Sequence, residues 1–418
     1  MTEDALAKTL EADVGLDATV ASSASGPHAA PSSPSSPTGA TLAATTRPSV
    51  LPRAGSTAGD APTERYAKKR VLGAGGMGEV VLAEDRDIGR DVALKYLTAS
   101  HDASAVARFV DEVRIVGSLE HPNIVPIHDV GRDESDRYYF VMKHVEGETL
   151  ESIIEKLAAG DPAHHERYTF TARAEIFIAL LHALQFAHAH GYVHRDIKPA
   201  NVMVGRFGEV VLMDWGVAKR CKGPEETGGA LEDDASKPVH ERLFTTRRGA
   251  IVGTPAYMSP EQSRGEIEAI DERSDIYCAC VLFYELLTLR HYLGERESVA
   301  AMLRAIQSEV PRMPFNEKTG PGQSPTPAEY LHFVHRGLHK EPAERFQNVG
   351  QMIDQLQRAI DGRVKVECPV TFTKRSAREI GRFVDRHPLL SMRLFFGGLF
   401  LFVALVVWSI VTAVRLHG

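Results

Sequence analysis

YVHRDIKPAN, residues 192–201, is the stretch that decides the fold of this chain. It sets an acid, two cations and an amide between apolar segments, and such a cluster is unfavourable near a core unless it does chemistry. Thirteen residues after Asn201, Asp214-Trp215-Gly216 follows the strand-like run 209–213. The two segments together predict a reactive site placed between buried elements.

The order His-Arg-Asp-x-Lys-x-x-Asn, followed by Asp-aromatic-Gly, resembles the catalytic and metal-binding loops of eukaryotic-type protein kinases. Other motifs of that family occur in the expected order, and over residues 66–360 the chain is similar to bacterial Hanks-type serine/threonine kinases. The resemblance implies an α+β, bilobal kinase fold. The kinase domain is expected at 65–360, with a β-rich N-lobe over about 65–142 and a mainly helical C-lobe over about 146–360.

A glycine-rich turn lies between two predicted strands, 69–72 and 79–84. Alone it is compatible with an ordinary hairpin, but Val92-Ala93-Leu94-Lys95 follows where a dinucleotide-binding fold would have a helix. Glycines let backbone N–H groups approach phosphate oxygens, and Lys95 would add a point charge. A solvated edge lysine is the ordinary alternative. The residues that the resemblance implies for ATP binding are Gly73, Ala74, Gly75, Gly76, Met77, Gly78, Val80, Ala93, Lys95, Met142, His144 and Val145.

The segment 103–119 is predicted to be a helix, because Val106, Phe109 and later valines recur at three- and four-residue steps. By resemblance, a helix acid pairs with Lys95. The spacing from Phe109 favours Glu112 over Asp111, and an ordinary surface acid is the alternative.

The catalytic loop carries the remaining chemistry that the resemblance implies. Asp196 would orient the substrate hydroxyl and accept its proton late in transfer, and Lys198 would neutralise charge on the γ-phosphate. Asn201 and Asp214 would hold Mg²⁺, with Mn²⁺ as the alternative metal, since both ions take oxygen ligands. The implied reaction transfers the ATP γ-phosphoryl group to protein Ser/Thr hydroxyls, with autophosphorylation, in membrane-associated signalling.

Regulation is predicted in the long segment that follows. Thr245 and Thr246 precede Arg247-Arg248, where family members often carry activating phosphates, and such a phosphate would pair with Arg195. Hydroxyls of a solvated loop are an equally weighted alternative.

The larger lobe offers further structural expectations. Glu261 should form an ion pair with Arg345, and Asp275, which opens a helix that is apolar nearly all round, should accept backbone N–H groups of the catalytic loop. The histidines of helix 171–190, among them His188, are expected at the surface or the helix end. Trp215 replaces the usual Phe and, when buried, needs a partner for its N–H.

The two ends of the chain differ from the domain. Residues 1–64, rich in Ser, Pro and Ala, are expected to be a disordered tail. Residues 361–393 read as a basic linker, and 394–414, LFFGGLFLFVALVVWSIVTAV, as a transmembrane helix. Positive-inside bias predicts a single-pass protein with the N-terminus and kinase domain in the cytoplasm and a very short C-terminal tail outside.

Partners follow from the same features. Protein substrates and ATP are implied by the resemblance, and the C-terminal helix and basic linker predict contact with membrane lipid. A formal net charge of −7 gives no general attraction to nucleic acid. A pseudokinase is disfavoured because Lys95, Asp196, Asn201 and Asp214 are all present, and a small-molecule kinase is disfavoured by the peptide-type segment 253–261. The sequence does not reveal the oligomeric state.

Overall fold

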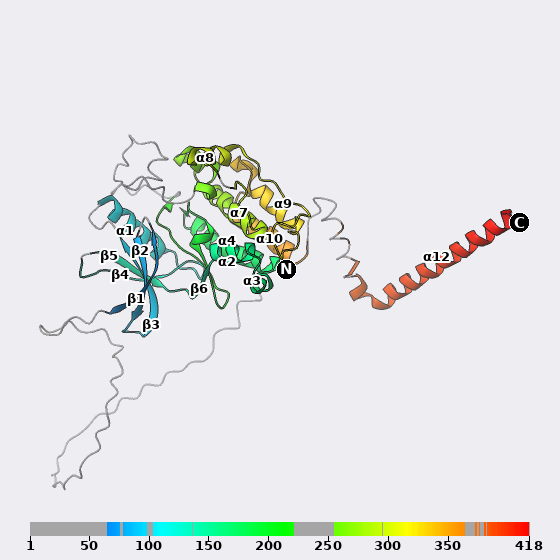
Figure 1. The fold of residues 1–418 in the computed structure, drawn as a ribbon, viewed down its shortest axis with the longest axis horizontal. Coiled ribbons are helices and arrows are strands. Elements are labelled where there is room, and N and C mark those ends of the chain that lie inside the picture. The colour runs from blue at the N-terminus through cyan, green and yellow to red at the C-terminus, as the bar shows by residue number, and fades with distance from the viewer. Residues whose placement is uncertain are drawn as a thin grey trace, which may run out of the picture. The chain divides into compact units, whose positions relative to one another are not determined.

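The computed structural model describes residues 65–75, 78–97, 103–135, 137–220, 255–294, 296–363, 373, 376, 380, 381 and 383–417 (Figure 1). The predicted disordered tail, 1–64, lies outside these residues. So do Gly76 and Met77 of the glycine-rich turn, Thr245 and Thr246, and part of the predicted linker. The domain boundaries therefore stay predictions.

A five-stranded antiparallel sheet forms the N-terminal part of the domain, with strand order β1-β2-β3-β5-β4 (Figure 1). Its strands are β1 Tyr66–Gly75, β2 Gly78–Asp85, β3 Arg90–Leu97, β4 Ile127–Arg132 and β5 Tyr138–Lys143. Helix α1, Ala103–Ser118, packs against β3 and β4. The expected β-rich lobe with one helix is thus present.

Strand β3 is buried on both faces, and this decides where Lys95 lies. Val92 and Leu94 belong to a small core on one face of the sheet, whereas Ala93 and Leu97 belong to the main core. Successive side chains of a strand point to opposite faces. Lys95 is therefore on the face that meets α1 and the rest of the domain.

The C-terminal part is mainly helical and centres on helix α7, Glu272–Thr288, whose side chains are almost all buried. Helix α4, Phe170–Ala189, packs on α7 and on α10, and α9 packs on α7. Phe177 of α4 stacks face to face on Phe283 of α7 with ring centroids 4.1 Å apart. The other helices are α2 Leu150–Ala158, α3 Pro162–Arg167, α6 Pro260–Arg264, α8 Val299–Ser308, α9 Ala328–Gly337 and α10 Val349–Ile360, with 3₁₀ turns at Pro199–Asn201, Pro255–Tyr257, Ile267–Ala269 and Pro342–Glu344.

Two short sheets hold the ends of the catalytic loop. One pairs β7, Tyr192–Val193, with β10, Lys219–Arg220; the other has the order β6-β8-β9, with bounds Gly147–Thr149, Val202–Gly205 and Val210–Leu212. The catalytic loop runs from β7 to β8, and Asp214 comes just after β9. Both reactive segments are thereby fixed at their ends by backbone hydrogen bonds.

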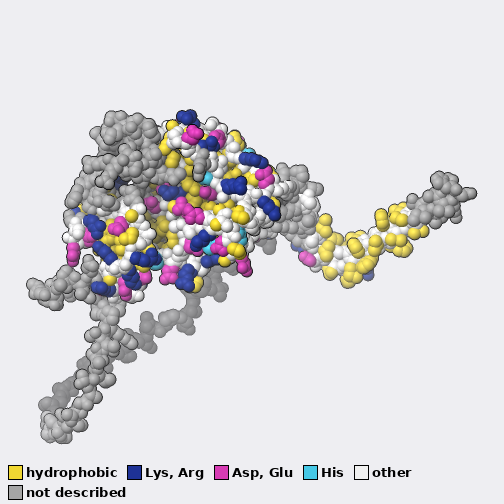
Figure 2. Space-filling model, in the orientation of Figure 1, with side chains coloured by type: hydrophobic (Ala, Val, Ile, Leu, Met, Phe, Trp, Pro, Cys, Tyr) yellow, Lys and Arg dark blue, Asp and Glu magenta, His cyan; other side chains and the backbone are white. Residues whose placement is uncertain are grey.

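Helix α12 spans Pro388–His417, and its residues 388–408 are mostly apolar and exposed. Phe395, Phe400 and Trp408 are 68%, 78% and 74% exposed, and Figure 2 shows hydrophobic side chains along the helix. Among the described helices, two are long and apolar enough to cross a membrane. One is α4, which is mostly buried in the domain; the other covers residues 388–408, and none of its window is buried.

Candidate active site

Lys95 joins three elements at the centre of the site. Its Nζ donates to Glu112 Oε1 of α1 at 2.6 Å and to Asp214 Oδ1 at 3.0 Å. Glu112 is 6% exposed, whereas Asp111 beside it faces solvent. The helix phase thus brings Glu112, and not Asp111, to the lysine. One ammonium group ties β3, α1 and the loop after β9 together.

Burial and the neighbouring charges together set the pKa values of Lys95, Asp214 and Glu112. Burial disfavours the charged form of Lys95, but the carboxylates of Asp214 and Glu112 outweigh this effect and raise its pKa above the ordinary value. Burial likewise opposes ionisation of Asp214, yet the charge and hydrogen bond of Lys95 lower its pKa. Burial raises the pKa of Glu112. Lys95 is therefore held as a cation that can meet phosphate oxygens.

The residues predicted to surround ATP lie on β1 to β3, on β5 and just after β5. Ala93 and Met142 are cross-strand partners, as are Val80 and Lys95. His144 and Val145 follow the end of β5, and Gly73, Ala74 and Gly75 close β1. At Gly78 a Cβ atom would lie 1.9 Å from the Tyr96 carbonyl oxygen, so this position requires glycine.

The catalytic loop folds back on Asp196. Lys198 Nζ donates to Asp196 Oδ2 at 2.7 Å, and Asn201 Nδ2 donates to the same oxygen at 3.0 Å and to the Asp196 carbonyl at 2.8 Å. The Asp196 side chain is 33% exposed. A half-buried carboxylate with one oxygen held by a cation and an amide is suited to receive a hydroxyl group at its other oxygen.

Asp275 of α7 holds the start of this loop. Its carboxylate, fully buried, accepts from the backbone N–H of His194 at 2.8 Å and of Arg195 at 2.9 Å. Arg195 adopts φ 70°, a left-handed backbone conformation that costs a non-glycine residue about 1–2 kcal/mol. The expectation that Asp275 accepts backbone groups of the loop is confirmed, and these bonds stabilise the strained backbone.

His188 lies in the last turn of α4, in agreement with the expected place at a helix end, but it is not at the surface. It is 6% exposed and its Nε2 lies 2.8 Å from Asp275 Oδ2. The apolar positions Leu181 and Leu184 stand seven and four residues before it, so the helical period already placed His188 on the buried face. It supplies the third hydrogen bond to Asp275.

Trp215 packs against His194 with ring centroids 4.6 Å apart, and His194 Nε2 lies 3.1 Å from the Met213 carbonyl oxygen. His194 thereby packs the catalytic loop against the segment that follows β9. Trp215 is 1% exposed, and within the described residues its indole N–H has no hydrogen-bond partner. The partner that a buried tryptophan was expected to need is therefore missing from this part of the chain.

The segment 255–262 is anchored beside the catalytic loop. Arg345 donates from Nη1 and Nη2 to the two Glu261 oxygens at 2.8 and 2.9 Å, and both side chains are at most 1% exposed. Ser274 Oγ donates to Glu261 Oε1 at 2.6 Å. The expected Glu261–Arg345 ion pair is confirmed. Ser259 and Gln262 form a reciprocal capping box at the start of α6, which the sequence reasoning missed.

The side chains fit a divalent cation. Asn201 uses its amide nitrogen toward Asp196, which leaves its amide oxygen available, and Asp214 uses Oδ1 toward Lys95. Among the described residues, neither Asn201 Oδ1 nor Asp214 Oδ2 takes part in a hydrogen bond. Oxygens of this kind are the ligands that Mg²⁺ prefers.

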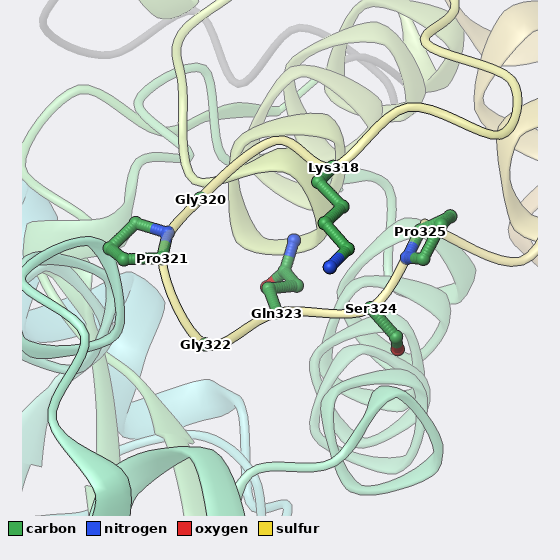
Figure 3. A pocket seen from close by; sticks show the side chains of 7 residues that line it. All are labelled: Lys318, Gly320, Pro321, Gly322, Gln323, Ser324 and Pro325. Atoms are coloured by element: carbon green, nitrogen blue, oxygen red, sulfur yellow. The ribbon is translucent and has the colours of Figure 1, made fainter.

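The hollow shown in Figure 3 lies elsewhere in the domain. It is formed by one loop and lined by Lys318, Gly320, Pro321, Gly322, Gln323, Ser324 and Pro325. None of the predicted site residues lines it. Its Gln323 instead supports the core, because Oε1 accepts from buried Arg173 at 2.7 Å. Burial lowers the pKa of Arg173 to about 10, and the Leu286 carbonyl near the end of α7 also accepts from it.

Comparison with known proteins identifies the family. The protein kinase domain family matches residues 66–356. The chain is 35% identical to a probable serine/threonine-protein kinase of Streptomyces coelicolor over 79% of this chain and 45% of that one. It is 34% identical to the serine/threonine-protein kinase PknB of Mycolicibacterium smegmatis, over 72% of this chain and 44% of PknB. It is 32% identical to the serine/threonine-protein kinase PknD of Protochlamydia amoebophila, over 72% and 30% of the two chains.

The chain spans less than half the length of these curated relatives. Members of the family take ATP and a divalent metal ion. The match covers all the elements that carry the site, from β1 to α10. The chain therefore belongs to the protein kinase family, and the relatives it resembles are bacterial serine/threonine kinases.

Proposed function

We propose that this protein is a membrane-anchored serine/threonine protein kinase that transfers the γ-phosphoryl group of Mg²⁺-ATP to protein Ser/Thr hydroxyls and phosphorylates itself. The observation that carries the proposal is the network in which Lys95 contacts both Glu112 and Asp214. Loss of this geometry is how a kinase fold is held inactive. The described residues already have it.

Each residue has a definite task in the proposed reaction. The ammonium group of Lys95 binds phosphate oxygens, and Glu112 fixes its direction. The acceptor hydroxyl donates to Asp196, which orients it and takes its proton late in transfer, while Lys198 stabilises negative charge beside it. Asn201 and Asp214 would hold the magnesium ion, which when bound neutralises charge on the phosphate oxygens.

The proposal includes regulation in the segment after β10. Thr245 and Thr246 are the proposed phosphate acceptors, and Arg195 is the proposed partner of the phosphate. Support comes from the place of Arg195, whose backbone is fixed by Asp275 at the start of the catalytic loop. A phosphate bound there would act on the segment that holds Asp196.

The test uses the full-length chain in detergent, with Mg²⁺ and radiolabelled ATP. Generic acceptor proteins and small-molecule acceptors are offered in parallel, and phosphorylated residues are mapped by mass spectrometry. We expect label on protein Ser or Thr, including Thr245 or Thr246. Asp196→Asn should abolish transfer and keep nucleotide binding, measured as an ATP-induced rise in melting temperature. Label on small molecules alone, or wild-type turnover by Asp196→Asn, would overturn the proposed reaction.

Membrane attachment through α12 is tested separately. The helix is exposed and apolar, and an arginine near the middle of a span disfavours insertion by about 2.5–3.5 kcal/mol. Val403→Arg combined with Phe400→Arg should move the protein from the membrane fraction to the soluble fraction. Val310→Arg, at a position 73% exposed on the kinase domain, is the matched control. Cytoplasmic orientation predicts that added protease digests the domain only in inverted vesicles.

A further inference from the structure

Gln262 links the segment 255–262 to the catalytic loop. Its Nε2 donates to the Arg195 carbonyl oxygen at 2.8 Å, across 67 residues of sequence. Its Oε1 accepts from the Ser259 backbone N–H at 2.9 Å and from the Cys278 thiol at 3.3 Å. The side chain is buried, so each of these bonds is made away from solvent.

The orientation of this amide follows from its neighbours. A carbonyl oxygen can only accept and a backbone N–H can only donate. Turning the amide over would set its oxygen against the Arg195 carbonyl and its NH₂ against the Ser259 N–H. Burial raises the pKa of the Cys278 thiol, so this group keeps its hydrogen and donates. One orientation alone satisfies all three partners.

Arg195 is thus fixed on both sides of its strained backbone. Asp275 accepts from its N–H at 2.9 Å, and Gln262 donates to its carbonyl oxygen. That carbonyl belongs to the peptide group that leads directly into Asp196. Rotation of this peptide group would move the Asp196 carboxylate. Two side chains hold the group: His194 Nδ1 accepts from its N–H at 3.2 Å, and the Gln262 amide donates to its carbonyl oxygen.

The anchor of Gln262 is itself rigid. The preceding residue, Glu261, accepts hydrogen bonds from both Nη atoms of Arg345 and from Ser274. Ser259 Oγ accepts from the Gln262 backbone N–H at 3.3 Å and completes the capping box. Adjacent residues of α6 therefore have different partners: Glu261 binds Arg345 and Ser274, and Gln262 binds the catalytic loop.

We infer that Gln262 is a positioning residue for phosphoryl transfer: its amide couples the seating of the 255–262 segment to the orientation of Asp196 through the Arg195 carbonyl. The inference rests on the proposed kinase function. It assigns Gln262 no contact with ATP or with the acceptor. Its loss should lower the rate of transfer and leave nucleotide binding unchanged.

Gln262→Glu isolates the decisive hydrogen bond, because the new carboxylate still accepts from Ser259 and Cys278 but does not donate to Arg195. Cys278→Ala is the matched control, since it removes another contact of the same side chain. With the full-length protein, Mg²⁺-ATP and a generic acceptor protein, we expect kcat of Gln262→Glu to fall about 10-fold or more. KM for ATP should stay within about 2-fold, and Cys278→Ala should keep kcat within about 2-fold.

A pH profile separates positioning from folding. A protonated carboxyl group can donate, so the deficit of Gln262→Glu relative to the wild type should grow as rising pH ionises the new side chain. If Gln262→Glu does not melt cooperatively, Gln262→Met replaces it as an uncharged variant of similar length, with ATP-induced stabilisation as proof of folding. It too should lose kcat alone.

The outcomes are distinct. Wild-type kcat in a folded Gln262 variant, or equal losses in that variant and Cys278→Ala, overturns the inference. A lower kcat with unchanged KM for ATP and the stated pH dependence supports it. Absence of turnover in the wild type, with ATP still bound, contradicts the proposed function instead, and this result is read before any variant is compared.

Discussion

Replacing Arg345 by lysine keeps its charge but removes the planar fork on which the segment 255–262 depends. Arg345 donates five hydrogen bonds: two to Glu261 and one each to the carbonyl oxygens of His339, Arg273 and Lys340. Lysine has three donors at a single nitrogen, so at least two of these acceptors lose their partner.

The magnitude follows from burial. The Arg345 side chain is 0% exposed and that of Glu261 1%, so water does not replace the lost bonds. Each buried acceptor left without a partner costs about 1–3 kcal/mol, and we expect Arg345→Lys to lower the free energy of unfolding by about 3 kcal/mol. Arg345→Met, which leaves the Glu261 charge unpaired, should lower it by about 3–5 kcal/mol.

Thermal unfolding of the full-length protein measures the effect. For a domain of this size, about 3 kcal/mol corresponds to a fall in melting temperature of roughly 5 °C. The control is Arg312→Lys, whose side chain is 81% exposed and whose ion pair with Glu317 should contribute little. Glu261→Gln combined with Arg345→Met should destabilise less than the sum of the single changes. A melting temperature for Arg345→Lys equal to that of Arg312→Lys would refute the reasoning.

Three further predictions concern other parts of the domain. Burial lowers the pKa of His291 to about 4, so the unfolded state binds more protons than the folded state between pH 6.5 and 4, and stability decreases as the pH is lowered. His291→Asn should remove about 1–2 kcal/mol of the stability that the wild type loses between pH 7 and 5. An equal fall in melting temperature of the variant and the wild type over this range would contradict the prediction. A Cβ at Gly337 would lie 2.1 Å from Cys280 Sγ, so Gly337→Ala should lower the free energy of unfolding by about 1–3 kcal/mol. Adding Cys280→Ala should restore more than half of this loss, and additive effects of the two changes would contradict the contact. Glu112→Gln should weaken the hold on Lys95 and lower kcat/KM for ATP at least about 10-fold, whereas Asp111→Asn, the exposed neighbour, should match the wild type; equal effects would refute the assignment.

The parts of the site that could be predicted depend on local spacing. Lys95 at the end of an apolar strand and Glu112 on an amphipathic helix both follow from periods that a sequence displays. The resemblance to a known family supplied the pairing of Lys95 with Glu112. The contact of Lys95 with Asp214 depends on the fold and was not predicted. The chemical roles of these residues stay predictions until turnover is measured.

The features that were missed fall into two groups. Two had a local signal that was not used: Ser259-x-x-Gln262 matches a capping box, and the period of α4 places His188 on the buried face. Arg173 had none. Of the three groups that accept from its side chain, only the Tyr168 carbonyl is near in the sequence. The Leu286 carbonyl and Gln323 lie 113 and 150 residues away, so only the folded chain shows why a cation is buried there.

Because the catalytic loop depends on Asp275, it can take its final conformation only after Asp275 has been synthesised. Asp275 is made 80 residues after Arg195, which at 5–20 residues per second is a delay of roughly 4–16 s on the ribosome. Until then a nascent chain already carries Lys95, Asp196 and Asp214 but lacks the carboxylate that accepts from the Arg195 N–H. A product that terminates early, before α7, has the reactive side chains without the frame that aligns them. Because synthesis starts at the N-terminus, the catalytic loop can be aligned only after its reactive side chains have been synthesised.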